Sequence, residues 1–262
     1  MSGKRTLYLG TNTKMFKTAA QTEDYLKELQ SLTKDLDRED LELFVIPSFT
    51  AIKPAAECAA ASRIRIGAQN ICWEEEGAFS GEISPLMAAE AGASIIMIGH
   101  SERRHIFGES NEMENKKVLC ALRNHFTALL CIGETAEEKA FHISDEVLST
   151  QLKIGLSNVA PNVVQNVWIA YEPVWAIGVN GVPAAADYIQ QRHAAIRQCL
   201  SSLFGPEQAI QIPILYGGSV NRENAVKISG VPNVDGLFIG RSAWNAQSFN
   251  QIIRDILATK RI

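Results

Sequence analysis

The chain of 262 residues has the composition of an ordinary folded protein, with 46% hydrophobic and 21% charged residues, which argues against intrinsic disorder. Its formal net charge of −4 carries no basic bias, so neither nucleic acid nor an anionic membrane is expected as a partner. The opening MSGKRTLYLG has too short an apolar stretch for a secretory signal, and no later run approaches the roughly 18 apolar residues of a membrane span. We therefore expect a cytoplasmic protein.

Short aliphatic or β-branched runs recur along the whole chain, and we predict them to be strands. They are nearly continuous in apolar character instead of alternating, which is typical of parallel strands covered on both faces. In chain order they span residues 7–11, 43–47, 64–68, 95–99, 128–132, 167–171, 214–216 and 237–240.

Helical patterns lie between these runs. In SPLMAAEAG, Ser84 is a candidate N-cap, Pro85 takes the first helical position and Gly92 follows the end. Apolar stripes at helical spacing also occur within 25–36, 188–203 and 249–256.

Strand and helix alternate throughout, and no linker divides the chain, so we expect one (β/α)8 barrel domain over residues 1–262. An open doubly wound sheet usually has fewer strands, and neither GxGxxG nor a Walker loop is present.

Polar residues gather where the predicted strands end, in TNTKMF, GHSERR, AYEPVWAIG, YGGSV and IGRSAWN. Parallel strands share their C-terminal face, so these fragments are expected on one rim. Taken singly, Lys14 could be a solvated lysine, His100 a structural histidine and YGGSV a tight turn. Found together, they favour a shared site.

The motifs TNTKM, GAQN, SGEIS, IGHSERR, CIGET, AYEPVWAIG, YGGSV and VDGLFIG resemble the signature set of the triosephosphate isomerase family, in family order and over essentially the whole chain. The resemblance implies an isomerase that moves a carbonyl between adjacent carbons of a small sugar phosphate through an enediol. It implies neither a cofactor nor a metal. The five cysteines, odd in number and without a CxxC pair, argue against a zinc site or a disulfide framework.

By this resemblance, Glu172 is the general base and His100 the electrophile that polarises the carbonyl. His100 opens a helical stretch whose dipole disfavours a second proton on the imidazole. Lys14 supplies a fixed positive charge, and Asn12 helps to polarise the same oxygen. Glu102 links His100 and Lys14, or is simply an ion-pair partner of Lys14.

The resemblance also implies a phosphate site formed mainly by backbone N–H groups of Gly178, Ser219, Gly240 and Arg241. Glycines permit such close approach.

The same resemblance makes the segment after Glu172 a lid. Pro173 fixes the backbone after the base, while Gly178 and Gly181 allow the next residues to move. The lid closes over the phosphate and excludes water, and Tyr216 and Ser219 resemble the residues that hold it closed.

Several positions depart from the family pattern. Thr13 replaces the usual Trp, Phe16 replaces Asn, the lid reads GVNG instead of GTGK, and Gly240-Arg241 replaces two glycines. Arg241 retains its backbone N–H and adds a cationic fork, unless its side chain points into solvent. The AIGxNG lid with FIGRSAWN is similar to the L-erythrulose-1-phosphate isomerase branch, which predicts interconversion of L-erythrulose 1-phosphate and D-erythrulose 4-phosphate. A genuine triosephosphate isomerase, acting on dihydroxyacetone phosphate and D-glyceraldehyde 3-phosphate, is the alternative.

Two other classes of protein are alternatives: a non-catalytic barrel that binds or scaffolds, and a barrel lyase or aldolase, which would need a Schiff-base lysine. Lys14 is the one candidate lysine on the predicted rim. The segment 73–84, WEEEGAFSGEIS, resembles the family's third loop, which reaches into a neighbouring subunit and implies a homodimer. A surface loop is the alternative.

Overall fold

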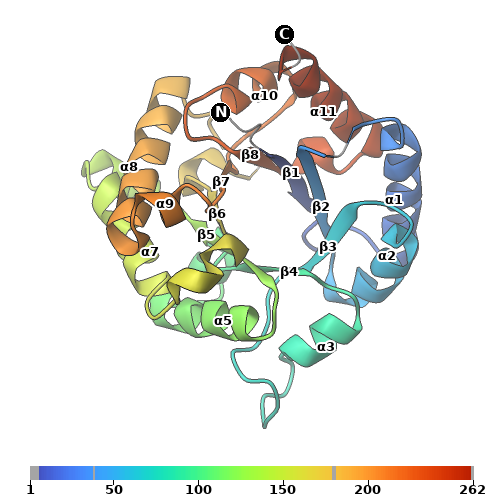
Figure 1. Cartoon of the computed structure of the whole chain (residues 1–262), viewed down its shortest axis with the longest axis horizontal. Coiled ribbons are helices and arrows are strands. Elements are labelled where there is room, and N and C mark those ends of the chain that lie inside the picture. The colour runs from blue at the N-terminus through green and yellow to red at the C-terminus, as the bar shows by residue number, and fades with distance from the viewer. Residues whose placement is uncertain (1–5, 38, 179–180, 261–262) are drawn as a thin grey trace.

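Eight parallel strands form a closed barrel in the computed structural model, which describes residues 6–37, 39–178 and 181–260 (Figure 1). The strands follow one another in sequence order, and β8 pairs with β1 to close the sheet. They are β1 Leu7–Asn12, β2 Leu41–Ile46, β3 Ile64–Ala68, β4 Ile95–Ile98, β5 Thr127–Ile132, β6 Val167–Tyr171, β7 Ile214–Tyr216 and β8 Gly236–Ile239. The predicted (β/α)8 barrel is confirmed.

The strands match the predicted runs to within two residues at each end. The largest difference is at β2, which begins at Leu41 and not at residue 43, because Glu42 interrupts the apolar run without leaving the ladder. Pro47 lies outside the strand, since it has no N–H to donate to a neighbouring strand.

Two separate apolar clusters explain why the strands read as continuous apolar runs. One cluster fills the barrel and includes Phe44, Trp168 and Phe238, while a larger one lies between the sheet and the helices. Each strand therefore buries both faces. Gly10 is required inside, because a Cβ at this position would lie 2.2 Å from the Phe44 ring.

Helices surround the barrel on its outside (Figure 1). The α-helices are α1 Ala19–Thr33, α2 Ile52–Ala59, α3 Pro85–Glu90, α4 Ser101–His105, α5 Asn111–Arg123, α6 Ala136–Ala140, α7 Ser144–Gly155, α8 Ala186–Phe204, α9 Pro206–Ala209, α10 Arg222–Ser229 and α11 Ala246–Lys260. Short 3-10 turns are η1 Phe49–Ala51, η2 Pro161–Asn166, η3 Val174–Ala176 and η4 Arg241–Ala243. Among the described residues, no helix has both the length and the apolar character to cross a membrane.

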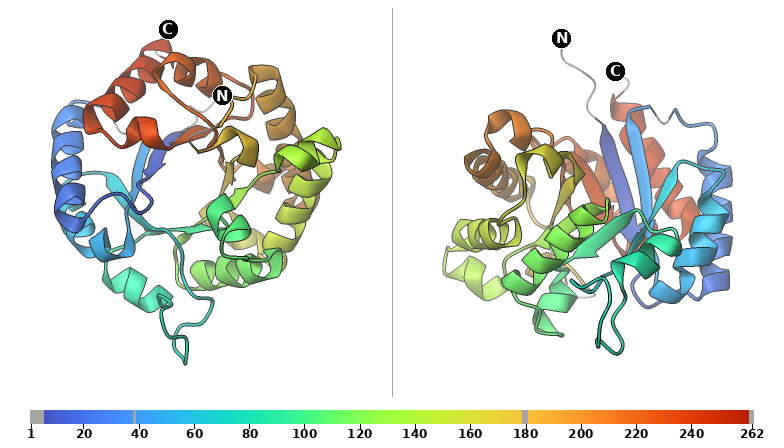
Figure 2. Two further views of the ribbon diagram at one scale, coloured as in Figure 1. Left: turned by 180° about the vertical axis from the view of Figure 1, so that it is seen from behind. Right: turned by 60° about the horizontal axis from the view of Figure 1, so that its bottom comes forward.

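The predicted helix signals act as expected at α3. The Ser84 hydroxyl accepts a hydrogen bond from the Leu86 N–H at 3.1 Å, Pro85 is the first helical residue, and Gly92 follows with φ of +94°. The connection between β3 and α3 projects away from the barrel (Figures 1 and 2). It contains the segment 73–84.

Candidate active site

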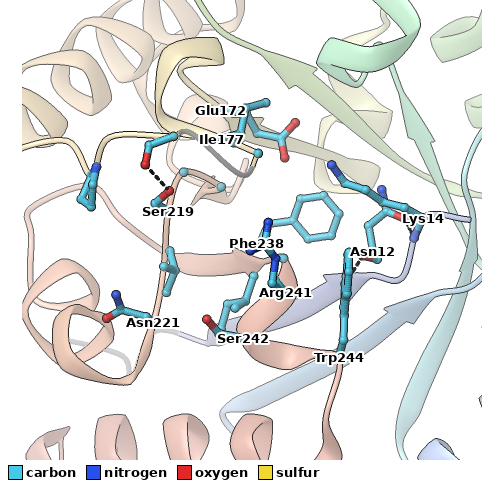
Figure 3. Close-up of a pocket in the computed structure, with 18 of the residues that line it drawn as sticks. Asn12, Lys14, Glu172, Ile177, Ser219, Asn221, Phe238, Arg241, Ser242 and Trp244 are labelled. Atoms are coloured by element: carbon cyan, nitrogen blue, oxygen red, sulfur yellow. Dashed lines mark hydrogen bonds between the residues drawn. The ribbon is translucent and has the colours of Figure 1, made fainter. Parts of the chain in front are cut away.

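A pocket of ≈ 350 Å³ opens where the strands end. Residues after β1, β4, β6, β7 and β8 line it, which are the five strand ends that the polar fragments marked. Figure 3 shows Glu172, Lys14, Asn12, Ser219 and Arg241 around the cavity, with Ser219 on the side opposite to Lys14 and Asn12. The predicted site residues therefore lie together, with the exception of Glu102, which contacts Lys14 beside the pocket.

Close backbone packing holds Glu172 at the end of β6. Its N–H donates to the Ile132 carbonyl at 2.8 Å, and a Cβ at Gly133 would lie 1.9 Å from the Glu172 carbonyl oxygen. Gly217 leaves space for the carboxylate, since a Cβ there would lie 2.6 Å from the Glu172 Cγ. The ends of both neighbouring strands are thus followed by a glycine against Glu172, Gly133 beside its backbone and Gly217 beside its side chain.

The carboxylate of Glu172 faces the imidazole of His100, with 3.7 Å between Oε2 and Nε2. Nδ1 of His100 accepts the backbone N–H of Glu102 at 3.2 Å, as the N-cap of α4. A ring nitrogen that accepts carries no proton in the neutral ring, so the proton lies on Nε2, on the side of Glu172. The Nε2–H of His100 therefore points to the part of the pocket where a ligand would also contact the Glu172 carboxylate.

The site perturbs the acidity of Glu172, which is only 5% exposed. Burial raises the pKa of this carboxyl above its ordinary value, although the neighbouring His100 and Lys14 oppose the shift. Oε2 has no hydrogen-bond partner among the described residues. A desolvated, unpartnered carboxylate oxygen is suited to accept a proton from a ligand.

Asn12 and Lys14 are held in one fixed arrangement. The Asn12 Oδ1 accepts from the Lys14 N–H at 2.8 Å and from Gln69 Nε2 at 3.1 Å, and Gln69 also donates to the Lys14 carbonyl at 2.7 Å. These bonds support the φ of +52° at Lys14. The Asn12 amide nitrogen meets only the Met97 sulfur, at 3.7 Å, a weak acceptor, and so keeps capacity to donate to a ligand.

Lys14 forms a 2.6 Å salt bridge with Glu102. The other oxygen, Oε2, lies 3.5 Å from Nδ1 of His100, but Nδ1 accepts the Glu102 N–H and carries no proton in the neutral ring. The Glu102 carboxylate therefore pairs with Lys14, and its backbone N–H bonds His100.

The other side of the pocket is lined by Gly178, Ser219, Gly240 and Arg241. Gly178 has φ of +84°, and a Cβ added at Gly240 would meet nothing within 4 Å. The Ser219 hydroxyl donates to the Ala176 carbonyl at 2.7 Å and so holds the connection after β6. Positions 179 and 180 of the predicted lid lie outside the described residues.

Arg241 is exposed and begins η4. Its guanidinium makes no hydrogen bond or salt bridge with any residue that the structure describes, whereas the other cation at the pocket, Lys14, is paired with Glu102.

One departure from the family pattern, Phe16, packs against Trp244. Its indole Nε1 donates to the Asn12 carbonyl at 2.8 Å, and its ring contacts Phe16 at a centroid distance of 4.6 Å. Thr13 is fully buried in the same strand end. The sequence motif IGRSAWN contains Trp244 but indicates no role for it, because nothing in a sequence shows which backbone group an indole will reach.

Arg104 is a second residue that the sequence did not single out. Its guanidinium donates to the carbonyls of Gly99 at 2.7 Å and Cys131 at 2.8 Å, and lies 2.5 Å from Glu114. It therefore ties the end of β4 to the end of β5. Burial raises the pKa of Glu114 to about 8, with Arg104 opposing the shift.

Taken together, these features define an acid–base site at the C-terminal mouth of a (β/α)8 barrel. No group of three or more His, Cys, Asp or Glu residues in the described parts of the chain is placed to hold a metal ion. The family model for triosephosphate isomerase matches residues 7–256. The chain belongs to the triosephosphate isomerase family.

Individual relatives agree with this assignment. The chain is 42% identical over 254 residues to the L-erythrulose-1-phosphate isomerase of Rhizobium etli, covering 96% of this chain and 93% of that protein. It is 40% identical to the triosephosphate isomerase of Trichlorobacter lovleyi, covering 95% and 98%. The crystal structure of triosephosphate isomerase from Bartonella henselae superposes with a TM-score of 0.86 at 33% identity, covering 96% and 99%.

Proposed function

We propose that this protein is a cofactor-independent isomerase that moves a carbonyl between adjacent carbons of a small sugar phosphate, with L-erythrulose 1-phosphate and D-erythrulose 4-phosphate as its preferred pair. The observation that carries the proposal is the 3.7 Å approach of the Glu172 carboxylate to the Nε2 side of His100 inside the pocket. A proton acceptor and a proton donor that both reach one small ligand are what an enediol mechanism requires.

In this mechanism, Glu172 takes a proton from the carbon beside the carbonyl, and the C–H electron pair forms the enediol double bond. The carbonyl oxygen gains negative charge, which His100 Nε2–H, Lys14 and the Asn12 amide stabilise. The former carbonyl oxygen takes the Nε2 proton of His100, and His100 takes the proton of the neighbouring hydroxyl in exchange. The carbon proton then returns from Glu172 to the former carbonyl carbon, while the deprotonated hydroxyl becomes the new carbonyl. No atoms are gained or lost.

The names of similar proteins support the four-carbon substrate. The relatives from Rhizobium etli, Brucella abortus and Mesorhizobium japonicum, at 42%, 42% and 40% identity, are named L-erythrulose-1-phosphate isomerase. Of the departures, Arg241 lines the pocket, and Phe16 packs against Trp244, which also lines it; a larger substrate would need a different wall there. Both substrates need the same base and electrophile, so the choice concerns fit and not chemistry.

The test is a comparison of kcat/KM for L-erythrulose 1-phosphate and dihydroxyacetone phosphate on one preparation. We expect the four-carbon substrate to have the higher value. A higher value for dihydroxyacetone phosphate would favour the second candidate, a triosephosphate isomerase, to which the relative from Trichlorobacter lovleyi points.

The substrate phosphate is proposed to bind at Gly178, Ser219, Gly240 and Arg241, through backbone N–H groups and the Arg241 guanidinium. The support is that all four line the pocket, and that an unpaired guanidinium matches a phosphate in geometry. We further propose that the connection after β6 acts as a lid over this group.

A Schiff-base lyase or aldolase fits the site less well. Lys14 is the lysine that lines the pocket, and its nitrogen is occupied by Glu102 at 2.6 Å. Treatment with borohydride in the presence of substrate should therefore trap no covalent adduct. In a non-catalytic barrel, nothing would compensate for the cost of burying the Glu172 carboxylate in the pocket.

We also propose a homodimer formed through residues 73–84, in the cytoplasm. Large apolar side chains are exposed around this segment and the nearby rim: Met15, Phe16, Phe79, Leu86, Met87, Ile106 and Phe107. Exposed apolar groups of this number are typical of an interface.

A further inference from the structure

The carboxylate of Glu134, which follows β5, contacts both ends of the connection between β6 and α8. Its Oε1 accepts the indole N–H of Trp175 at 2.9 Å and the hydroxyl of Tyr188 at 2.8 Å. Trp175 lies in η3, just after Glu172, whereas Tyr188 lies in the first turn of α8. One side chain from a third segment thus joins the start of this connection to its end.

Glu134 depends on these donors because it is completely buried, at 0% exposure. The remaining donor is the Tyr171 hydroxyl, 3.2 Å from both oxygens. No described lysine, arginine or histidine forms a salt bridge with Glu134, as the ion pairs of the described chain all involve other carboxylates. A buried carboxylate held by neutral donors alone is strongly destabilised when one of them is lost.

The hydroxyl of Tyr188 keeps its proton and therefore remains a hydrogen-bond donor. Burial and the bond to Glu134 raise the pKa of its hydroxyl, against the opposing effect of Ser144. Since the single hydroxyl proton of Tyr188 goes to Glu134, the Ser144 hydroxyl at 3.0 Å donates to Tyr188 and not the reverse.

The contact between the two ends of the connection is also made by rings. The rings of Trp175 and Tyr188 meet edge to face at a centroid distance of 5.5 Å. The Lys139 ammonium lies over both, 3.3 Å from the Trp175 centroid and 4.9 Å from that of Tyr188. The packed rings and the Lys139 ammonium therefore hold the Tyr188 ring, and with it the hydroxyl that bonds Glu134, in one orientation.

Glu134 is also linked to the base through the backbone. Its carbonyl accepts the Val174 N–H at 2.9 Å, and the preceding Gly133 touches the Glu172 carbonyl so closely that no Cβ would fit. A shift of Glu134 is therefore passed directly to residues 172–175.

We infer that Tyr188 is a positioning residue: through Glu134, its hydroxyl keeps Trp175 and the backbone after Glu172 in place, so that Ile177 and Gly178, which line the pocket, keep their positions while the enediol exists. This inference rests on the proposed isomerase function. An enediol phosphate that is exposed to water can expel phosphate instead of being reprotonated, so a loosened connection should change the products and not only the rate.

The test compares Tyr188→Phe with Ser144→Ala as a matched control, which removes a neighbouring hydroxyl but leaves the Tyr188 bond to Glu134. Isomerised product and released inorganic phosphate are measured together with Tm. For Tyr188→Phe we expect a loss in kcat/KM on the order of tenfold and several times more phosphate per isomerisation. For Ser144→Ala we expect an unchanged product ratio.

A double-mutant cycle with Trp175→Phe tests whether the two ends act through one carboxylate. The effects on the product ratio should then be non-additive, so that the double variant releases less phosphate than the product of the single effects predicts. An unchanged product ratio in Tyr188→Phe, or independent multiplying effects, would overturn the inference alone. A wild-type protein that isomerises neither sugar phosphate would overturn the proposed function, and the inference with it.

Discussion

Nε2 of His100 and Oε2 of Glu172 lie 3.7 Å apart, at the ends of two strands that have β5 between them. The approach is possible because Gly133 follows β5, at a place where the backbone of Glu172 leaves no room for a side chain. The imidazole is held by the Glu102 N–H, which donates to Nδ1, and the backbone of Glu172 is held by its N–H bond to Ile132 in β5. Both groups are thus in position before a ligand binds, which is the condition for efficient proton transfer.

Shortening the base should slow the reaction sharply. In Glu172→Asp the carboxylate withdraws by one methylene from the ligand and from His100. A positioned general base typically contributes about 10² to 10⁴ in rate, so we expect kcat to fall on the order of 10²-fold, with a small change in KM. Steady-state kinetics with L-erythrulose 1-phosphate measures this. A loss below tenfold would argue against Glu172 as the base.

The pH dependence of kcat/KM should report the buried carboxyl. Burial raises the pKa of Glu172 above the ordinary 4.5, and the base acts only when ionised. Activity is therefore full above the raised pKa and falls as pH drops through it, about tenfold per unit. We expect the acid limb of the profile at a pH above 4.5 in the wild type. A profile that is flat down to pH 4.5 would contradict the prediction.

A methyl group beside the base should disturb activity more than stability. In Gly217→Ala the new Cβ would lie 2.6 Å from Cγ and 2.9 Å from Oε1 of Glu172, so the carboxylate must move. Misplacement of a reacting group by about 1 Å can cost on the order of 10²-fold, and we expect kcat to fall at least tenfold.

Gly230→Ala is the matched control for this change. Its nearest contacts would be at 3.5 and 3.7 Å, an ordinary separation, and its φ of −89° suits alanine. We expect wild-type kcat. Equal losses in the two variants would show that the effect of Gly217→Ala is not specific to Glu172.

The strands and the rim were predictable because burial on both faces leaves a continuous apolar run, and the carboxyl ends of parallel strands meet at one face. Glu172 and His100 follow such runs directly. The start of β2 was predicted two residues late because Glu42 lies within the strand. Local apolar character cannot show that a charged residue still pairs in the ladder.

The supporting contacts could not be predicted, since they depend on how distant segments align in space. Gln69 reaches Asn12 across the sheet, and Trp244 reaches the same residue from the far end of the chain. Tyr188 was correctly placed on a helical stripe, but helical periodicity describes a ring that packs and not a hydroxyl that finds Glu134. Contacts of this kind are found only from the three-dimensional structure.

Breaking the proposed interface should yield monomers. Phe79 is 40% exposed within segment 73–84 and packs only against Trp73 among the ring contacts described. A charge in the core of an interface commonly costs about 2 kcal/mol or more, roughly 30-fold in Kd. We expect Phe79→Asp to dissociate the dimer in sedimentation at micromolar concentration. Ile210→Asp, which alters a side chain 63% exposed and outside this segment, should sediment as the wild type does.

Acid stability should depend on His193, which is completely buried in α8. One ring nitrogen lies 3.0 Å from the Asn233 carbonyl, and the other, Nε2, has no partner in the described chain. Burial lowers the pKa of His193 from 6.5 to about 4, with Arg197 acting in the same direction and the bond to Asn233 against it. The folded protein therefore binds this proton less readily than the unfolded chain does.

It follows that the contribution of His193 to stability is complete above pH 6.5 and is lost as pH falls toward 4. The size is about 3 kcal/mol at most, at about 1.4 kcal/mol for each pKa unit. In His193→Gln the amide can still donate to Asn233 but does not titrate, so its unfolding free energy should fall less between pH 7.5 and pH 4. Urea unfolding of both proteins across this range measures the difference. Parallel curves would show that His193 is not the group responsible.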